Sequence, residues 1–150
     1  MAKLTIDDAR QSLAAHVTEK GIQLYEKYGP QIGWKELLEI LKDKVFVRYP
    51  CEIIFDAAPL HPGEFAAPIP KGDRPEDGFN IFVHPFFSLD PSRVPALVFY
   101  HLVVVNYGEF ATADDAELFG AAALGILKDE YYAQLCALAD EVSGDADAVG

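Results

Sequence analysis

The stretch "VPALVFYHLVVVNYGEF", residues 94–110, is almost wholly apolar but carries a histidine, His101, near its middle. A helix that is apolar on all sides is expected to be buried on all sides, so we predict that His101 lies inside the protein. A buried imidazole needs a partner for each ring nitrogen, because an unsatisfied buried polar group costs about 1–3 kcal/mol. The partner is either a hydrogen-bonding group of the core or a metal ion.

The nearest acidic candidates follow in the next predicted helix. Asp115 stands three residues after Thr112, which is the spacing of a capping box, and Glu117 also fits as a solvated first-turn acid favoured by the helix dipole. His101 lies about two turns before Gly108, roughly 10 Å along the axis. In an antiparallel pair of helices Glu117 would therefore reach back level with His101, so we prefer it to Asp115 as the partner.

Other side chains could complete a site around His101. A catalytic zinc ion takes three protein ligands, and the sequence offers His84 in "FVHPFF" and His61 in "LHPGE" beside His101 and Glu117. The structural interpretation of His61 and His84 is that loop histidines next to proline face solvent or bind backbone. The predicted cleft residues are His101, Glu117, Asp115, Asn106 and Glu64. Asn106 has its own structural interpretation, as a helix-end amide that ties down the following turn.

The elements that must position these residues can be read from pattern. "TIDD" at 5–8 is a capping-box variant that opens a helix to about residue 28, and a second helix runs from about 33 to 43. Strands are predicted at 44–49, 51–56 and 79–83, because these stretches are rich in β-branched and aromatic residues. The proline-rich stretch 57–78 is expected to be loop with a short edge strand near 64–67.

The second half of the chain is predicted to be helical. A central buried helix covers 92–107, another helix opens at Thr112 and runs to about 127, and a last helix covers about 129–142. The predicted buried stripe of that last helix is Tyr132, Leu135, Cys136, Ala139 and Val142. We expect one globular domain over 1–143 and a disordered acidic tail over 144–150. The fold class is α+β, with a small, mainly antiparallel or mixed sheet packed by several helices.

This order of elements, over roughly residues 33–127, resembles the zincin metallopeptidases, specifically the small glutamate-zincins. The most specific part is "DDAELFGAAALG" at 114–125, which is similar to the helix that supplies their third metal ligand. Aligned on Phe119, either Asp115 or Glu117 takes the place of the metal-binding acid. The resemblance implies a zincin-like fold with a cleft beside the edge strand.

The catalytic HExxH motif of that family is degenerate in this chain. It supplies two zinc-binding histidines one helical turn apart and a glutamate that activates water. If His101 is the first histidine, Leu102 and Val105 replace the glutamate and the second histidine. If His101 is the second, Leu97 and Val98 stand where the first histidine and the glutamate should be. Neither register leaves a catalytic pair.

Charge is distributed unevenly along this chain of net charge −12. Residues 1–50 are net +1, residues 51–108 are −4 and residues 109–150 are −9. An acidic carboxyl-terminal third repels phosphate backbones, so nucleic acid is not an expected partner. The longest apolar run is too short to cross a bilayer, and the first 20 residues lack the features of a targeting segment, so we expect a cytoplasmic protein with no membrane partner.

We predict a zincin-like domain that no longer catalyses peptide hydrolysis and that binds a protein or peptide partner. One alternative is a divalent-metal hydrolase with unusual ligands, in which zinc would be held by His101 and Glu117 or Asp115 with His84 or His61. Another is an acidic interaction protein that engages a basic partner through its carboxyl-terminal third.

Overall fold

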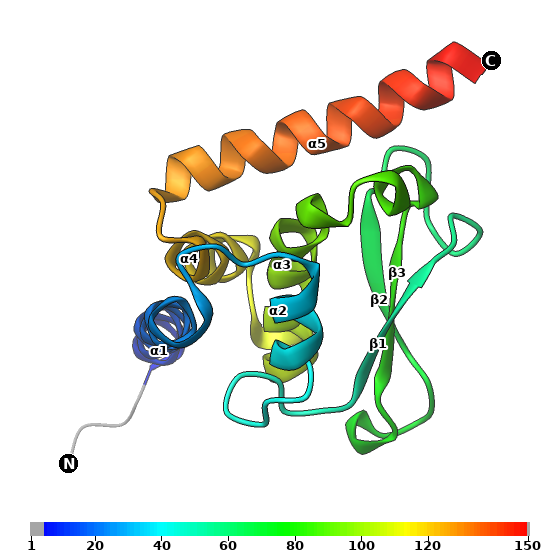
Figure 1. Cartoon of the computed structure of the whole chain (residues 1–150). Helices are drawn as coiled ribbons and strands as arrows, with labels where there is room; N and C mark the ends of the chain where they lie inside the picture. Colours follow the sequence, from blue (N-terminus) through cyan, green and yellow to red (C-terminus); the bar gives the residue numbers. More distant parts are fainter. Residues whose placement is uncertain (1–4, 150) are drawn as a thin grey trace.

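The computed structural model describes the backbone of residues 5–149 and, Asp7 apart, the side chains of residues 5–142. It confirms an α+β fold, in which helices surround a small mixed sheet (Figure 1). The helices are α1 (Ile6–Tyr28), α2 (Trp34–Ile40), α3 (Val94–Tyr107), α4 (Ala113–Leu124) and α5 (Lys128–Val149), and the strands are β1 (Cys51–Phe55), β2 (Ala66–Pro70) and β3 (Phe79–Val83).

Two helices begin at the capping boxes that the sequence predicts. Thr5 accepts a hydrogen bond from the backbone N–H of Asp8, whose carboxylate accepts one from the N–H of Thr5. Thr112 and Asp115 form the same pair at the start of α4. Each box satisfies two of the N–H groups that the first turn of a helix leaves without a partner.

The sheet has the strand order β1-β3-β2. β1 runs parallel to β3, with Ile53 opposite Ile81, and β2 runs antiparallel to β3, with Pro68 opposite Ile81. The strand predicted at 79–83 is confirmed, and the predicted short edge strand is present but lies at Ala66–Pro70. Proline has no N–H to donate to a neighbouring strand, so it is confined to edge strands. Its presence in β2 agrees with the position of β2 at the edge of the sheet.

The prediction of a strand at 44–49 is wrong, because this segment forms a turn and an irregular connection. The N–H groups of Phe46 and Val47 bond to the Asp43 carbonyl. The Asn106 side chain satisfies two further backbone groups, the Phe46 carbonyl and the Arg48 N–H. Local turn bonds and one side chain therefore replace the strand partner that the β-branched sequence favours.

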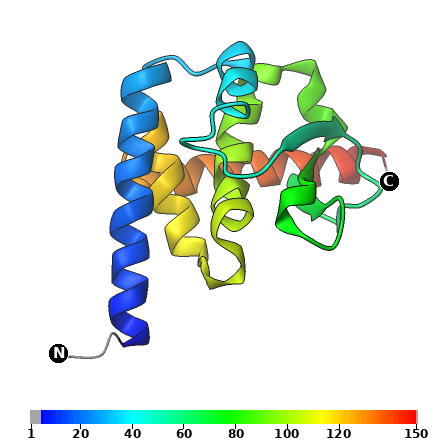
Figure 2. The same ribbon diagram turned by 90° about the horizontal axis from the view of Figure 1, so that it is seen from below.

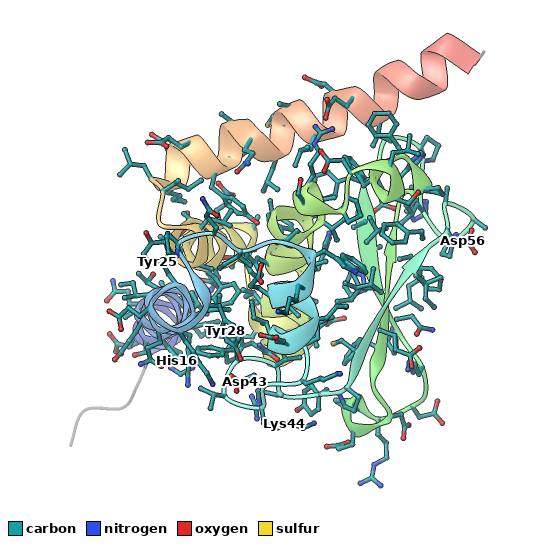
Figure 3. All side chains as sticks on the ribbon, in the orientation of Figure 1. His16, Tyr25, Tyr28, Asp43, Lys44 and Asp56 are labelled. Atoms are coloured by element: carbon teal, nitrogen blue, oxygen red, sulfur yellow. The ribbon has the colours of Figure 1, made fainter. Side chains whose placement is uncertain are left out.

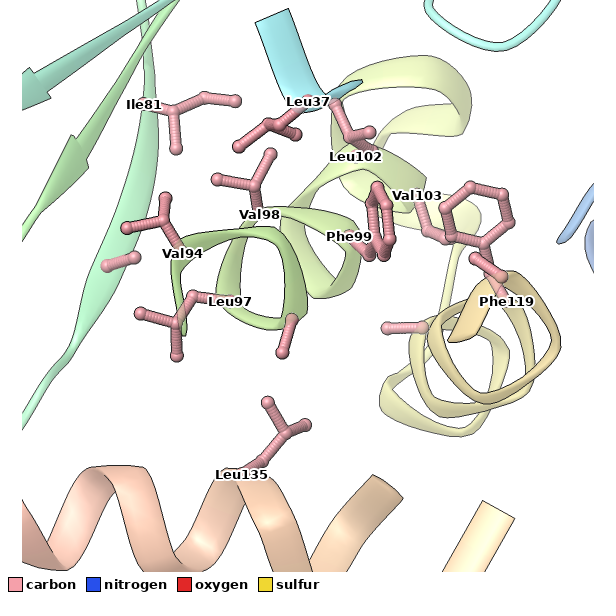
Figure 4. Close-up of a cluster of buried hydrophobic side chains, with 14 of the residues drawn as sticks. Leu37, Ile81, Val94, Leu97, Val98, Phe99, Leu102, Val103, Phe119 and Leu135 are labelled. Atoms are coloured by element: carbon pink, nitrogen blue, oxygen red, sulfur yellow. The ribbon is translucent and has the colours of Figure 1, made fainter. Parts of the chain in front are cut away.

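α3 is the central element of the molecule. The sheet packs on one side of it, α4 and α1 lie side by side on the other, and α5 crosses over α3 and α4 (Figures 1 and 2). The close-up of the core shows Leu97, Val98 and Phe99 of α3 among side chains of α2, β3, α4 and α5 (Figure 4). The predicted central helix is thus present, beginning at Val94 after a short 3₁₀ turn at Pro91–Arg93.

α5 differs from the predicted last helix in its length and in the face it buries. It continues to Val149, over most of the 144–150 segment predicted as a disordered tail, whose side chains and last residue lie outside the described part. Nothing in residues 143–149 is proline, so the helical backbone can continue. The buried face consists of Tyr131, Leu135, Leu138 and Val142, whereas Tyr132 and Cys136 are exposed. Within residues 5–149, no helix combines the length and the hydropathy that a membrane span needs.

Candidate functional site

A cavity of about 320 Å³ lies where α3, α4 and α5 meet the segment that leads into β2. It brings together three of the predicted cleft residues, His101, Glu117 and Glu64, from three separate elements. The lining residues are Gly63, Glu64, Phe65, Ala66, Tyr100, His101, Glu117, Tyr132, Leu135, Cys136 and Ala139. Its volume falls at the lower end of the range of small-molecule sites, about 300–1,000 Å³.

His101 is half-buried in the wall of this cavity. Its Nε2 atom is shielded from solvent and has no hydrogen-bond partner among the described residues. The sequence predicted a hydrogen-bonded imidazole, but at Nε2 the described residues supply no hydrogen bond. Two other aromatic rings contact the imidazole instead. The ring centroids of Phe65 and Tyr100 stand 6.0 and 5.3 Å from that of His101, both in edge-on contact.

The environment keeps His101 neutral at physiological pH. Burial lowers the pKa of the imidazole from 6.5 to about 4, and the opposing effect of the Glu64 charge is smaller. A neutral imidazole has one N–H donor and one nitrogen with an accepting lone pair. His101 can therefore accept a hydrogen bond from a ligand but cannot supply a positive charge.

Two carboxylates give the cavity its negative character. One oxygen of Glu64, Oε1, already accepts a hydrogen bond from the His61 backbone N–H at 2.6 Å. No hydrogen bond to the Glu117 side chain is present in the described structure, and Glu117 lies close enough to Tyr100 to contribute to raising the pKa of its hydroxyl, after the larger effect of burial. Both acids are half-buried, so their charges are screened less than those at the surface.

The hydroxyl groups of Tyr100 and Tyr132 and the thiol of Cys136 complete the polar part of the lining. Tyr132 and Cys136 lie one turn apart on α5, and the neighbouring Cys136 is the main cause that raises the pKa of Tyr132. Sequence reasoning placed both in the buried stripe and missed them as site residues. Tyr100 was also missed, although its position next to His101 on the predicted central helix was a usable signal.

The remaining predicted site residues lie elsewhere. Asp115 is buried in the capping box at the start of α4, which is the structural role that its spacing from Thr112 predicted. It does not line the cavity. Asn106 ties the end of α3 to residues 46–48 rather than to the turn that follows it. His84 caps a short 3₁₀ helix, where its Nδ1 accepts from the Phe86 N–H at 3.1 Å. His61 is exposed, and neither loop histidine lines the cavity.

The side chains around His101 do not fit a zinc ion as they stand. Of the proposed metal ligands, His101 and Glu117 line the cavity and His84 and His61 do not. In the part of the chain that the structure describes, no three His, Cys, Asp or Glu side chains are grouped as a metal site requires. A catalytic zinc site needs three protein ligands, and the described side chains around His101 do not supply them.

The chain was also compared with known proteins. No protein-family model matches it, and neither a curated protein nor a solved structure matches it at a significant level.

Proposed function

We propose that this chain is a zincin-like domain with an eroded catalytic motif, which binds a protein or peptide partner in the cytoplasm. Its binding site is the cavity around His101. The observation that carries the proposal is the buried Nε2 of His101, which has no partner among the described residues and lies in the wall of a cavity that also holds two carboxylates. Leu102 and Val105, one and four residues after His101, are both buried apolar side chains, which supports binding rather than hydrolysis.

We propose further that the ligand group is a basic side chain of the partner, an alkylammonium or a guanidinium. Glu64 and Glu117 supply negative charge, and the rings of Tyr100 and Tyr132 supply faces that attract cations. Nε2 of the neutral His101 offers an acceptor to an N–H group, once a small side-chain movement uncovers this shielded atom. The net charge of −9 over residues 109–150 would attract the same kind of partner.

Calorimetric titration with the single amino-acid derivatives N-acetyl-arginine amide and N-acetyl-lysine amide tests this function. Both should bind, whereas N-acetyl-norleucine amide, which has a similar length and no charge, should not. Glu117→Gln should weaken binding about tenfold, because it removes one charge-assisted contact. Glu39→Gln makes the same change at an exposed acid of α2, outside the cavity, and should leave binding unchanged. Equal binding of all three derivatives would contradict the proposal.

A further inference from the structure

A second cavity, of about 210 Å³, lies between α1, residues 45–48 and the end of α3. It shares no lining residue with the cavity around His101. Three cationic or titratable nitrogen side chains, His16, Lys20 and Arg48, take part in its lining, and no acid does. The other lining residues are Val45, Phe46, Val103, Asn106, Tyr107 and Phe119.

This cluster is unusual for a chain with 24 acidic and 12 basic residues. Among the side chains that the structure describes, five cations pair with carboxylates: Lys27, Lys71, Arg74, Arg93 and Lys128. Lys20 and Arg48 belong to none of these pairs. Two cations thus border one cavity without a compensating acid, although acids outnumber bases by two to one.

Arg48 is held in place by Asn106. The Arg48 backbone N–H donates to Oδ1 of Asn106 at 2.9 Å, and its Nη1 donates to the Asn106 backbone carbonyl at 3.1 Å. Asn106 is itself fixed by a bond of 2.7 Å from its Nδ2 to the Phe46 carbonyl. A guanidinium has five N–H donors in a planar fork, and within the described structure only the one bond from Nη1 to Asn106 uses them, so most are available for an anion.

The two lining side chains from α1, His16 and Lys20, also contact aromatic residues that line the cavity. His16 and Lys20 are four residues apart, so they lie on the same face of the helix. The His16 ring meets Tyr107 edge-on at 5.5 Å, and Nζ of Lys20 lies 5.9 Å from the centre of the Phe46 ring. Figure 3 shows His16 on the side of α1 nearest the loop that carries Asp43 and Lys44. Side chains from three segments therefore converge on one small space.

We propose that this second cavity binds a phosphate group, either as inorganic phosphate or as part of a small phosphorylated molecule. Arginine matches the oxygens of phosphate with paired N–H donors, and lysine adds a point charge. A volume of about 210 Å³ is below the range of about 300–1,000 Å³ for drug-sized ligands. The site therefore suits a single phosphate group, not a whole nucleotide. It is independent of the function proposed for the cavity around His101.

Calorimetric titration of the full chain with inorganic phosphate, at fixed ionic strength, tests the site. Phosphate should bind, and acetate at the same ionic strength should bind much more weakly. Lys20→Gln and Arg48→Gln should each raise the Kd about tenfold. Lys20 is half-buried but makes no hydrogen bond in the described structure, so its replacement should disturb folding little. Lys35→Gln removes the same charge at an exposed position of α2 and should leave the Kd unchanged.

A parallel titration with glycerol 3-phosphate distinguishes the two sources of the group. Tighter binding of the ester than of inorganic phosphate assigns the site to a phosphorylated small molecule, and the reverse order assigns it to free phosphate. No binding of either, or an equal loss in Lys20→Gln and Lys35→Gln, would overturn the proposal. Intact binding of N-acetyl-arginine amide by the same samples would show that only this inference had failed.

Discussion

Glu64 and His101 line one cavity from two different elements: Glu64 lies in the segment that leads into β2, and His101 lies in the middle of α3. The Glu64 charge favours a protonated imidazole, but burial has the larger effect and brings the pKa of His101 down to about 4. The fold therefore holds a neutral histidine next to a carboxylate.

Acidification should destabilise the protein through His101. An unfolded chain binds this proton near pH 6.5 and the folded chain near pH 4, so between these values the unfolded state holds more protons. The free energy of unfolding should then fall by at most about 1.4 kcal/mol for each pH unit below 6.5. Urea denaturation at pH 7, 6 and 5 measures the slope.

The variant His101→Gln isolates this effect because glutamine does not titrate. It should flatten the dependence of unfolding free energy on pH between 4 and 6.5. His61→Gln makes the same change at an exposed histidine and should keep the wild-type slope. An unchanged slope in His101→Gln would show that His101 is not responsible.

Asn106→Ala should cost about 2–4 kcal/mol of unfolding free energy. The substitution leaves the buried Phe46 carbonyl and the Arg48 N–H without their partner, and each unsatisfied buried group costs about 1–3 kcal/mol. Asn80→Ala is the matched control, because Oδ1 of Asn80 is buried but has no hydrogen-bond partner in the described structure. Thermal and urea denaturation should show a clearly smaller loss for Asn80→Ala, and equal losses would contradict the role of Asn106.

Gly120→Ala should destabilise the packing of α4 against α5. A Cβ at this position would lie 2.2 Å from the ring of Tyr131, which is fully buried and donates from its hydroxyl to the Ala96 carbonyl at 2.6 Å. Overpacking of this kind costs about 1–3 kcal/mol, although alanine is better than glycine in a free helix. In a double-mutant cycle with Tyr131→Leu the cost should shrink, and a cost independent of residue 131 would be inconsistent with a clash.

Protein purified without chelators should contain less than one equivalent of zinc and should not cleave casein. The reason is that Leu102 and Val105 cannot act as base and metal ligand. Metal analysis by mass spectrometry and a standard protease assay measure both outcomes. Bound zinc near one equivalent that is lost in His101→Ala would instead favour the divalent-metal hydrolase considered from the sequence.

Local signals in the sequence predicted most of the helices, and tertiary contacts decided what it missed. Thr5 and Thr112 mark helix starts correctly because a capping box is built within four residues. The strand expected at 44–49 does not form. Backbone groups of this segment bond to the side chain of Asn106, some 60 residues away in the chain, and not to another strand. No local pattern carries that contact.

The rotation of α5 has a similar explanation. Both the predicted stripe and the observed one contain Leu135 and Val142, so helical spacing alone could not choose between them. Which face of α5 is buried depends on Gly120, because the absence of a side chain there makes room for the ring of Tyr131. Tyr132 and Cys136 consequently face the cavity around His101 instead of the core. The presence of His101 and Glu117 in the lining of one cavity was predictable, because it follows from helical rise and a short connection between α3 and α4.

Four of the residues that line the cavity around His101 belong to α5: Tyr132, Leu135, Cys136 and Ala139. A ligand there would touch α5 and the rest of the fold at once, so occupancy and the docking of this helix are thermodynamically linked. Any ligand that requires the docked helix stabilises it by RT ln(1 + [L]/Kd). Amide hydrogen exchange along α5 would then slow as the cavity fills, which makes the helix a reporter of binding even where the ligand itself gives no signal.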